Sequence, residues 1–227
     1  MKKVIQVCLA VFAAILFVTP AWANSSITRV SNIAAEMFND LNLSGMELEV
    51  MSTQYAKQDP WIQDLLRQSP SEFESGTMVT ALYYQGTCTV LVNTQVAEQE
   101  QGMGENNGIP KDDQLFFATA HTVSHCVSQH KYSKGQKNPA VPAPLIVLSD
   151  VLKHKEEAFA DILASLYVRT KKDNAGTILS DVLGRRIEAA DAGEAIQSTA
   201  IYVTAAMKYE GELRFSSLVD VSNAIRM

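Results

Sequence analysis

The sequence predicts an α+β protein that is predominantly α-helical, with a small β-hairpin or sheet packed near a helix that carries two histidines. Apolar residues recur at helical spacing through most of the 227-residue chain. By contrast, residues 77–93 are rich in β-branched and aromatic residues on both sides of a glycine-containing break. A mean hydropathy near zero is ordinary for a globular protein of this size with one core.

The first 23 residues have the pattern of a secretory signal peptide. Lys2 and Lys3 precede an uncharged apolar run over residues 4–18, and a small-residue sequence then ends at Ala23. A membrane anchor would need roughly 20 apolar residues and flanks that hold it, so the run fits that alternative less well. We therefore expect cleavage after Ala23, a periplasmic or secreted location, no stable membrane anchor, and a single domain over residues 24–227.

The chain is acidic, with a formal net charge of −6, which becomes −8 when Lys2 and Lys3 leave with the signal peptide. Such a chain repels phosphate backbones and anionic lipids, and no basic run or basic amphipathic helix compensates. We therefore expect no nucleic-acid partner. The expected partner is a peptide or protein ligand in the cell envelope, whereas the oligomeric state does not follow from the sequence.

Cys88 and Cys126 are the two cysteines that remain after removal of the signal peptide. An even number of cysteines in an exported chain favours a disulfide bond. In the chain-entropy model, closing a loop of roughly forty residues stabilises a fold by about 3–4 kcal/mol. The alternative makes Cys126 a metal ligand beside His125, but successive residues on a helix point about 100° apart and do not face the same ion.

The segments before the histidines are predicted to form two helices, a hairpin and a loop. Residues 27–43 have amphipathic helical spacing, and residues 60–68 follow Asp59, a good N-cap, with proline at the first helical position. In the hairpin over residues 77–93, Gly86 can supply the positive φ that a tight turn requires. Residues 98–110 are rich in Gly, Asn and Gln and predict a surface loop.

The rest of the chain is predicted to be helical. Asp112 or Asp113 can cap a helix over residues 114–129, which contains both histidines. A connection with glycine and proline follows over residues 134–144. Helical spacing then resumes over residues 145–152, 156–169, 175–188, 194–209 and 215–225.

His121 and His125 are four residues apart, a spacing that places both imidazoles on one face of a helix, where they can bind one metal ion. The alternative is a pair of ordinary histidines. However, the surrounding segment is uncharged and apolar, and burying unpaired imidazoles there would be costly. Glu157 and Asp161 share a helical face by the same spacing, and their alternative is a solvated helix surface.

The gluzincin zinc metallopeptidases have an HExxH helix that is followed by a helix carrying ExxAD. This chain resembles them in its histidine pair and in the sequence EAFAD at residues 157–161. The resemblance implies that His121, His125 and Glu157 bind Zn²⁺ and that Asp161 accepts a hydrogen bond from a histidine ring nitrogen. It also implies a metallopeptidase-like domain over residues 24–227, in which residues 87–93 form the strand that pairs with an extended substrate.

The sequence departs from this family at Thr122, where the HExxH motif has its glutamate. That glutamate is the general base, whereas a threonine hydroxyl is neutral and cannot take a proton from metal-bound water near neutral pH. Loss of a general base commonly costs a factor of about 10² to 10⁴ in rate. The resemblance therefore implies a degenerate member of the family, a zinc-binding pseudoenzyme with impaired or lost proteolytic activity.

Two alternatives remain open. The first is an active periplasmic metallopeptidase with an unconventional base or proton shuttle, for which Glu105, Glu156, His130 and His154 are candidates. Of these, Glu156 is expected to point away from Glu157 into solvent. The second is a non-enzymatic envelope protein whose histidines are structural and which acts through protein interactions.

Overall fold

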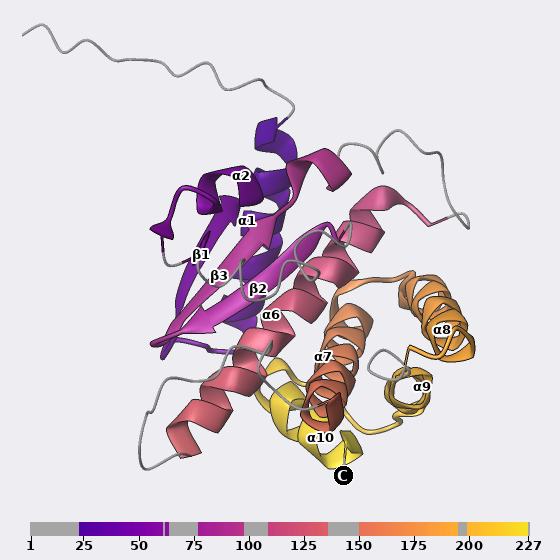
Figure 1. Cartoon of the computed structure of the whole chain (residues 1–227). Helices are drawn as coiled ribbons and strands as arrows, with labels where there is room; N and C mark the ends of the chain where they lie inside the picture. Colours follow the sequence, from indigo (N-terminus) through magenta and orange to yellow (C-terminus); the bar gives the residue numbers. More distant parts are fainter. Residues whose placement is uncertain are drawn as a thin grey trace, which may run out of the picture.

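The protein is a predominantly helical α+β structure, as the sequence predicts (Figure 1). The computed structural model describes residues 23–60, 62–63, 77–97, 109–135, 150–194 and 199–226. Its strands are β1 (Glu47–Ser52), β2 (Val79–Tyr84) and β3 (Thr87–Val92). Its helices are α1 (Ala23–Asp40), α2 (Thr53–Ala56), α6 (Lys111–Gly135), α7 (Asp150–Lys171), α8 (Ala175–Asp191), α9 (Ala200–Lys208) and α10 (Leu218–Arg226), with a 3₁₀ turn η3 (Phe215–Ser217) before α10.

The predicted hairpin is confirmed as β2 and β3, which pair antiparallel in a three-stranded sheet of order β1-β3-β2. Gln85 and Gly86 connect them with φ values of 48° and 92°. A two-residue hairpin turn whose twist matches that of the strands needs positive φ at both central residues. This requirement explains the glycine at position 86.

The prediction that residues 87–93 form a substrate-pairing strand is wrong. β3 lies in the middle of the sheet, parallel to β1 on one side and antiparallel to β2 on the other. Its backbone groups are therefore already used on both edges. β1 was not expected as a strand, although Glu47 and Glu49 alternate with apolar residues as in a half-buried strand.

Several helix boundaries also differ from those expected. α7 runs without a break through residues 153–155, because lysine and histidine in a helix interior cost little. α8 extends to Asp191 and ends before Gly193, which has a φ of 82°. Helical geometry is seen at Pro60 and at residues 62–63, whereas the rest of the predicted helix to residue 68 lies outside the described residues.

Some predictions concern parts of the chain that the structure does not describe. The predicted signal peptide up to residue 22 and residues 98–108 of the predicted surface loop belong to them. So do residues 136–149, which contain most of the predicted connection after the histidine helix. Among the described helices, none has both the length and the apolar character needed to cross a membrane.

Helix α6 occupies the middle of the fold, with the sheet on one side and α7 on the other (Figure 1). Its contacts with α1, β2 and α7 bury apolar side chains on several faces, among them Phe116, Ala120, Val123 and Val127. Cys126 of α6 is bonded to Cys88 of β3, both of them buried. The helix that carries the histidines is thus held between the sheet and the C-terminal helices.

Candidate metal centre

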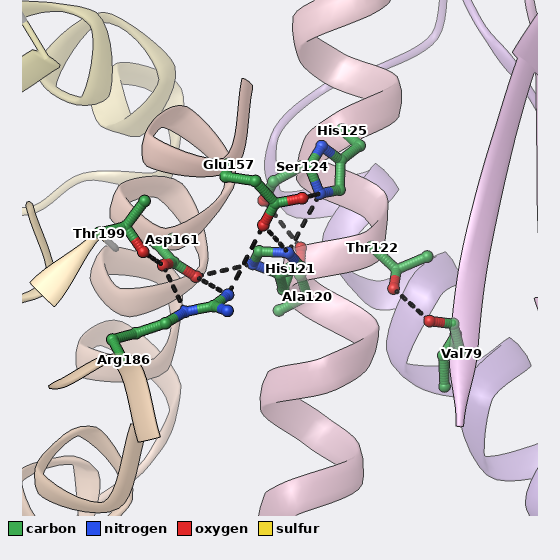
Figure 2. Close-up of polar contacts among 10 residues, drawn as sticks. All are labelled: Val79, Ala120, His121, Thr122, Ser124, His125, Glu157, Asp161, Arg186 and Thr199. Atoms are coloured by element: carbon green, nitrogen blue, oxygen red, sulfur yellow. Dashed lines mark hydrogen bonds and ion pairs between the residues drawn. The ribbon is translucent and has the colours of Figure 1, made fainter. Parts of the chain in front are cut away.

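The two histidines of α6 face Glu157 of α7 (Figure 2). His121 Nε2 lies 3.0 Å from His125 Nε2 and 3.3 Å from Glu157 Oε2. His125 Nε2 lies 3.4 Å from Glu157 Oε1. A tetrahedral ion with ligands at ~2.1 Å needs ligand atoms about 3.4 Å apart. The three side chains are therefore spaced to bind one metal ion, and in the described part of the chain they alone form such a cluster.

The cluster is partly open to solvent. The side chains of His121, His125 and Glu157 are 16%, 10% and 22% exposed. Three protein ligands with access to water are typical of catalytic zinc sites, in which the fourth position is left for water or a ligand, whereas structural sites use four protein ligands. The three clustered side chains are therefore partly accessible to water.

Asp161 lies behind His121, one turn along α7 from Glu157. Its Oδ1 atom is 2.9 Å from His121 Nδ1, and its side chain is completely buried. A carboxylate at this nitrogen favours the tautomer in which Nδ1 carries the proton and Nε2 offers its lone pair. Asp161 therefore lies beside the ring nitrogen of His121 that faces away from the cluster.

Two residues of the site were not anticipated from the sequence, Arg186 of α8 and Thr199 before α9. Arg186 donates hydrogen bonds of 2.8 Å from Nε to Asp161 Oδ2 and from Nη2 to Asp161 Oδ1. The Thr199 hydroxyl donates to Asp161 Oδ2. Helical spacing could have indicated Arg186, because it follows the buried Val182 of α8 by one turn.

The charges in the cluster shift the pKa of each member. Burial disfavours a charged His121, but the Asp161 and Glu157 carboxylates outweigh it and raise its pKa to about 9. Burial lowers the pKa of His125 to about 4. Burial would raise the pKa of Glu157, yet the histidines beside it lower that pKa to about 2. Despite burial, mainly the charge of Arg186 holds the pKa of Asp161 well below its usual range.

Thr122, the position of the missing general base, points away from the cluster toward the sheet (Figure 2). Its hydroxyl donates a 3.3 Å hydrogen bond to the Val79 carbonyl of β2. The carbonyl of Met78, the residue before Val79, accepts a hydrogen bond from the backbone amide of Asn93. Successive carbonyls of a strand point to opposite edges, so the Val79 carbonyl points to the outer edge of the sheet. Thr122 therefore joins α6 to an edge strand and offers the site no proton acceptor of its own.

Replacing Thr122 by valine should lower the free energy of unfolding by about 1 kcal/mol, because the Val79 carbonyl loses a buried donor. Metal content should not change, since Thr122 is not among the clustered side chains. Urea unfolding and metal analysis of the same preparation measure both effects. A fall in metal content at unchanged stability would mean that the hydroxyl acts on the metal centre and not on the helix–sheet contact.

The residues considered as substitutes for the base have other contacts. Glu156 was expected to be solvated, and this prediction is wrong. Its side chain hydrogen-bonds Ser128 of α6, and burial raises its pKa. The His130 Nδ1 atom is 2.6 Å from the Tyr83 hydroxyl. The ring of His154 packs against Tyr202 with centroids 5.9 Å apart. Glu105 lies outside the described residues.

No family model matches this chain, and the comparisons with curated proteins and with solved structures also find no match. The donor set and geometry of the cluster are the features of this chain that bear on its function. Two imidazoles and a carboxylate at these distances could hold a metal ion. Position 122 contributes no carboxylate to this cluster, because it is occupied by Thr122, which points toward the sheet.

Proposed function

We propose that the protein is an exported zinc-binding protein with a gluzincin-like metal centre and impaired or lost proteolytic activity. The observation that carries this proposal is the spacing of His121, His125 and Glu157, whose ligand atoms all lie within 4.8 Å of one another. A His₂Glu set is one that zinc peptidases use, and its distances here match a tetrahedral ion.

The residues of the site would have two roles: some would be zinc ligands, and others would orient those ligands. His121, His125 and Glu157 would be the ligands, and Asp161 fixes the ring of His121 through Nδ1. Zinc, when bound, polarises a carbonyl oxygen or lowers the pKa of water. Thr122 offers only a neutral hydroxyl that is already donated to Val79, so the proton transfer needed for peptide hydrolysis has no carboxylate base at that position.

Elemental analysis of the purified mature protein tests the proposal. We expect about one zinc per chain in the wild type and a strong loss in His125→Ala, since three protein ligands are needed to hold the ion. Absence of any metal, with thermal stability unchanged by added zinc or a chelator, would favour the structural-histidine envelope protein. Iron in place of zinc would also contradict the proposal.

A casein digestion assay separates the pseudoenzyme from an active peptidase. The zinc-loaded wild type should cleave casein slowly or not at all, because the rate contribution of a general base is about 10² to 10⁴. Fast cleavage that disappears in His121→Ala would instead establish an active hydrolase with an unconventional base.

The proposed export is supported by the pattern of the first 23 residues and by the bonded pair Cys88 and Cys126. N-terminal sequencing of the protein recovered from the cell envelope or the medium is the direct measurement. We expect it to begin at Asn24. Recovery of an uncleaved chain from the cytoplasm would remove this part of the proposal.

Zinc affinity should increase about tenfold for each pH unit between roughly pH 6 and 8. With a pKa of about 9, His121 is protonated in the metal-free protein over this range, so zinc must displace a proton from Nε2. His125 and Glu157, with pKa values of about 4 and about 2, are already deprotonated and release none. Zinc binding should therefore release one proton per ion, so that zinc affinity rises with pH and levels off above about pH 9.

Competition with a chromophoric chelator, corrected for the chelator's own protonation, measures this slope. Calorimetry in two buffers of different ionisation enthalpy counts the released protons independently. If zinc affinity does not change between roughly pH 6 and 8, His121 is neutral before the metal binds.

A further inference from the structure

Arg186 is the one cation seen in contact with both carboxylates of the site, within the part of the chain that the structure describes. Besides its two hydrogen bonds to Asp161, its Nη2 atom lies 3.7 Å from Glu157 Oε2. Its side chain is only 15% exposed. It comes from α8, an element that contributes no metal ligand (Figure 2).

The contacts leave the Asp161 carboxylate no freedom to rotate. Oδ1 lies between His121 Nδ1 and Arg186 Nη2, at 2.9 Å and 2.8 Å. Oδ2 accepts from Arg186 Nε and from the Thr199 hydroxyl. A planar guanidinium that binds both oxygens fixes the plane of a carboxylate as well as its position. The orientation of His121, which depends on Oδ1, is therefore set by α8 and Thr199 as much as by α7.

Simple charge balance would not require this geometry. A buried aspartate could be neutralised by any cation nearby, whereas here the guanidinium binds side-on to Asp161 and turns its Nη2 edge toward Glu157. Arg186 thus contacts the residue behind one ligand and a second ligand directly. It lies on α8, beyond the two motifs that resemble the gluzincins.

We propose that Arg186 is a positioning residue of the metal centre, which orients His121 through Asp161 and holds the Glu157 carboxylate toward the two histidines. This inference rests on the proposed zinc function. It assigns to α8 a role in metal affinity, although α8 supplies no ligand.

The test compares two adjacent arginines of α8. Arg186→Gln removes the buried contacts, and Arg185→Gln removes an exposed arginine whose ion pair is with Asp181 of its own helix. Zinc affinity should weaken about 10- to 100-fold in Arg186→Gln, the range typical of residues that orient metal ligands. It should stay at the wild-type value in Arg185→Gln. The absorption spectrum of the Co²⁺-loaded protein should change only in Arg186→Gln, because it reports ligand geometry.

A double-mutant cycle tests whether Arg186 acts through Asp161. In an Asp161→Asn background, Arg186→Gln should have a smaller effect on zinc affinity than it has alone, and the remaining effect measures its direct contact with Glu157. Arg186→Lys, which keeps the charge but loses the two-pronged contact, should give an intermediate affinity and provides a folded variant if Arg186→Gln does not fold. Circular dichroism establishes which variants are folded.

The outcomes are distinguishable. Failure of the wild type to bind zinc overturns the proposed function together with this inference. Normal zinc binding by the wild type with equal affinities and Co²⁺ spectra in Arg186→Gln, Arg186→Lys and Arg185→Gln overturns the inference alone. Weaker binding by Arg186→Gln with full additivity in the Asp161→Asn background would show that Arg186 does not act through Asp161, and would overturn the inference as stated.

Discussion

Replacing Asp161 by alanine should lower the free energy of unfolding of the metal-free protein by about 3–5 kcal/mol, because breaking a buried ion pair leaves the other charge without a partner. Asp161 is completely buried and is bound by Arg186, His121 and Thr199, all of which lose this acceptor. Arg186 is itself mostly buried, so water does not easily replace the carboxylate. Urea unfolding at pH 7 measures the change.

The matched control is Asp220→Ala on α10. Asp220 also forms an ion pair, with Lys131, but its side chain is 83% exposed. Exposed pairs contribute about 0–1 kcal/mol, so this variant should remain close to the wild type. Equal, small effects of both substitutions would mean that Arg186 finds another partner and that the Asp161 network is not a major source of stability.

Removing the disulfide by Cys88→Ala and Cys126→Ala together should destabilise the protein by about 3–4 kcal/mol in the chain-entropy model. The bond joins β3 to α6 across 38 residues of sequence, and both cysteines are buried. Most of the expected loss arises in the unfolded chain, which gains conformational freedom when the loop is opened. Urea unfolding of the double variant beside the oxidised wild type measures it.

Reduction of the wild type under unfolding conditions gives a second estimate without any substitution. The reduced chain should unfold at a lower urea concentration than the oxidised chain, by an amount that matches the double variant. A difference below about 1 kcal/mol in both experiments would show that the unfolded chain is already compact around these two segments.

The sequence contained enough information for the parts of the site that depend on local spacing. His121 and His125 are one helical turn apart, as are Glu157 and Asp161, and a helix places such pairs on one face whatever surrounds it. The hairpin was predictable for the same reason, since Gly86 and the residues beside it determine the turn. Whether the two pairs meet depends on how α6 and α7 pack, which no local pattern specifies.

The missed features are those that depend on tertiary contacts. β1 pairs in parallel with β3, and its alternation of glutamates with Leu48 and Val50 is a short period-2 pattern that indicates a strand but does not specify its partner. Arg186 and Thr199 lie 25 and 38 residues from Asp161, outside any motif that links them to it. The direction of Thr122 likewise follows from the position of the β2 edge beside α6.

The helix that carries both histidines is fastened to the sheet at two points, by the covalent bond from Cys126 to Cys88 and by the hydroxyl of Thr122 on Val79. These two attachments restrain rotation of the helix about its own axis, whether or not the proposed ion is bound. The empty and loaded forms should therefore share one backbone, and loading should cost little reorganisation. In zinc fingers, by contrast, the ion itself drives folding. If the cluster binds zinc as proposed, chelation should leave the protein folded and able to bind zinc again.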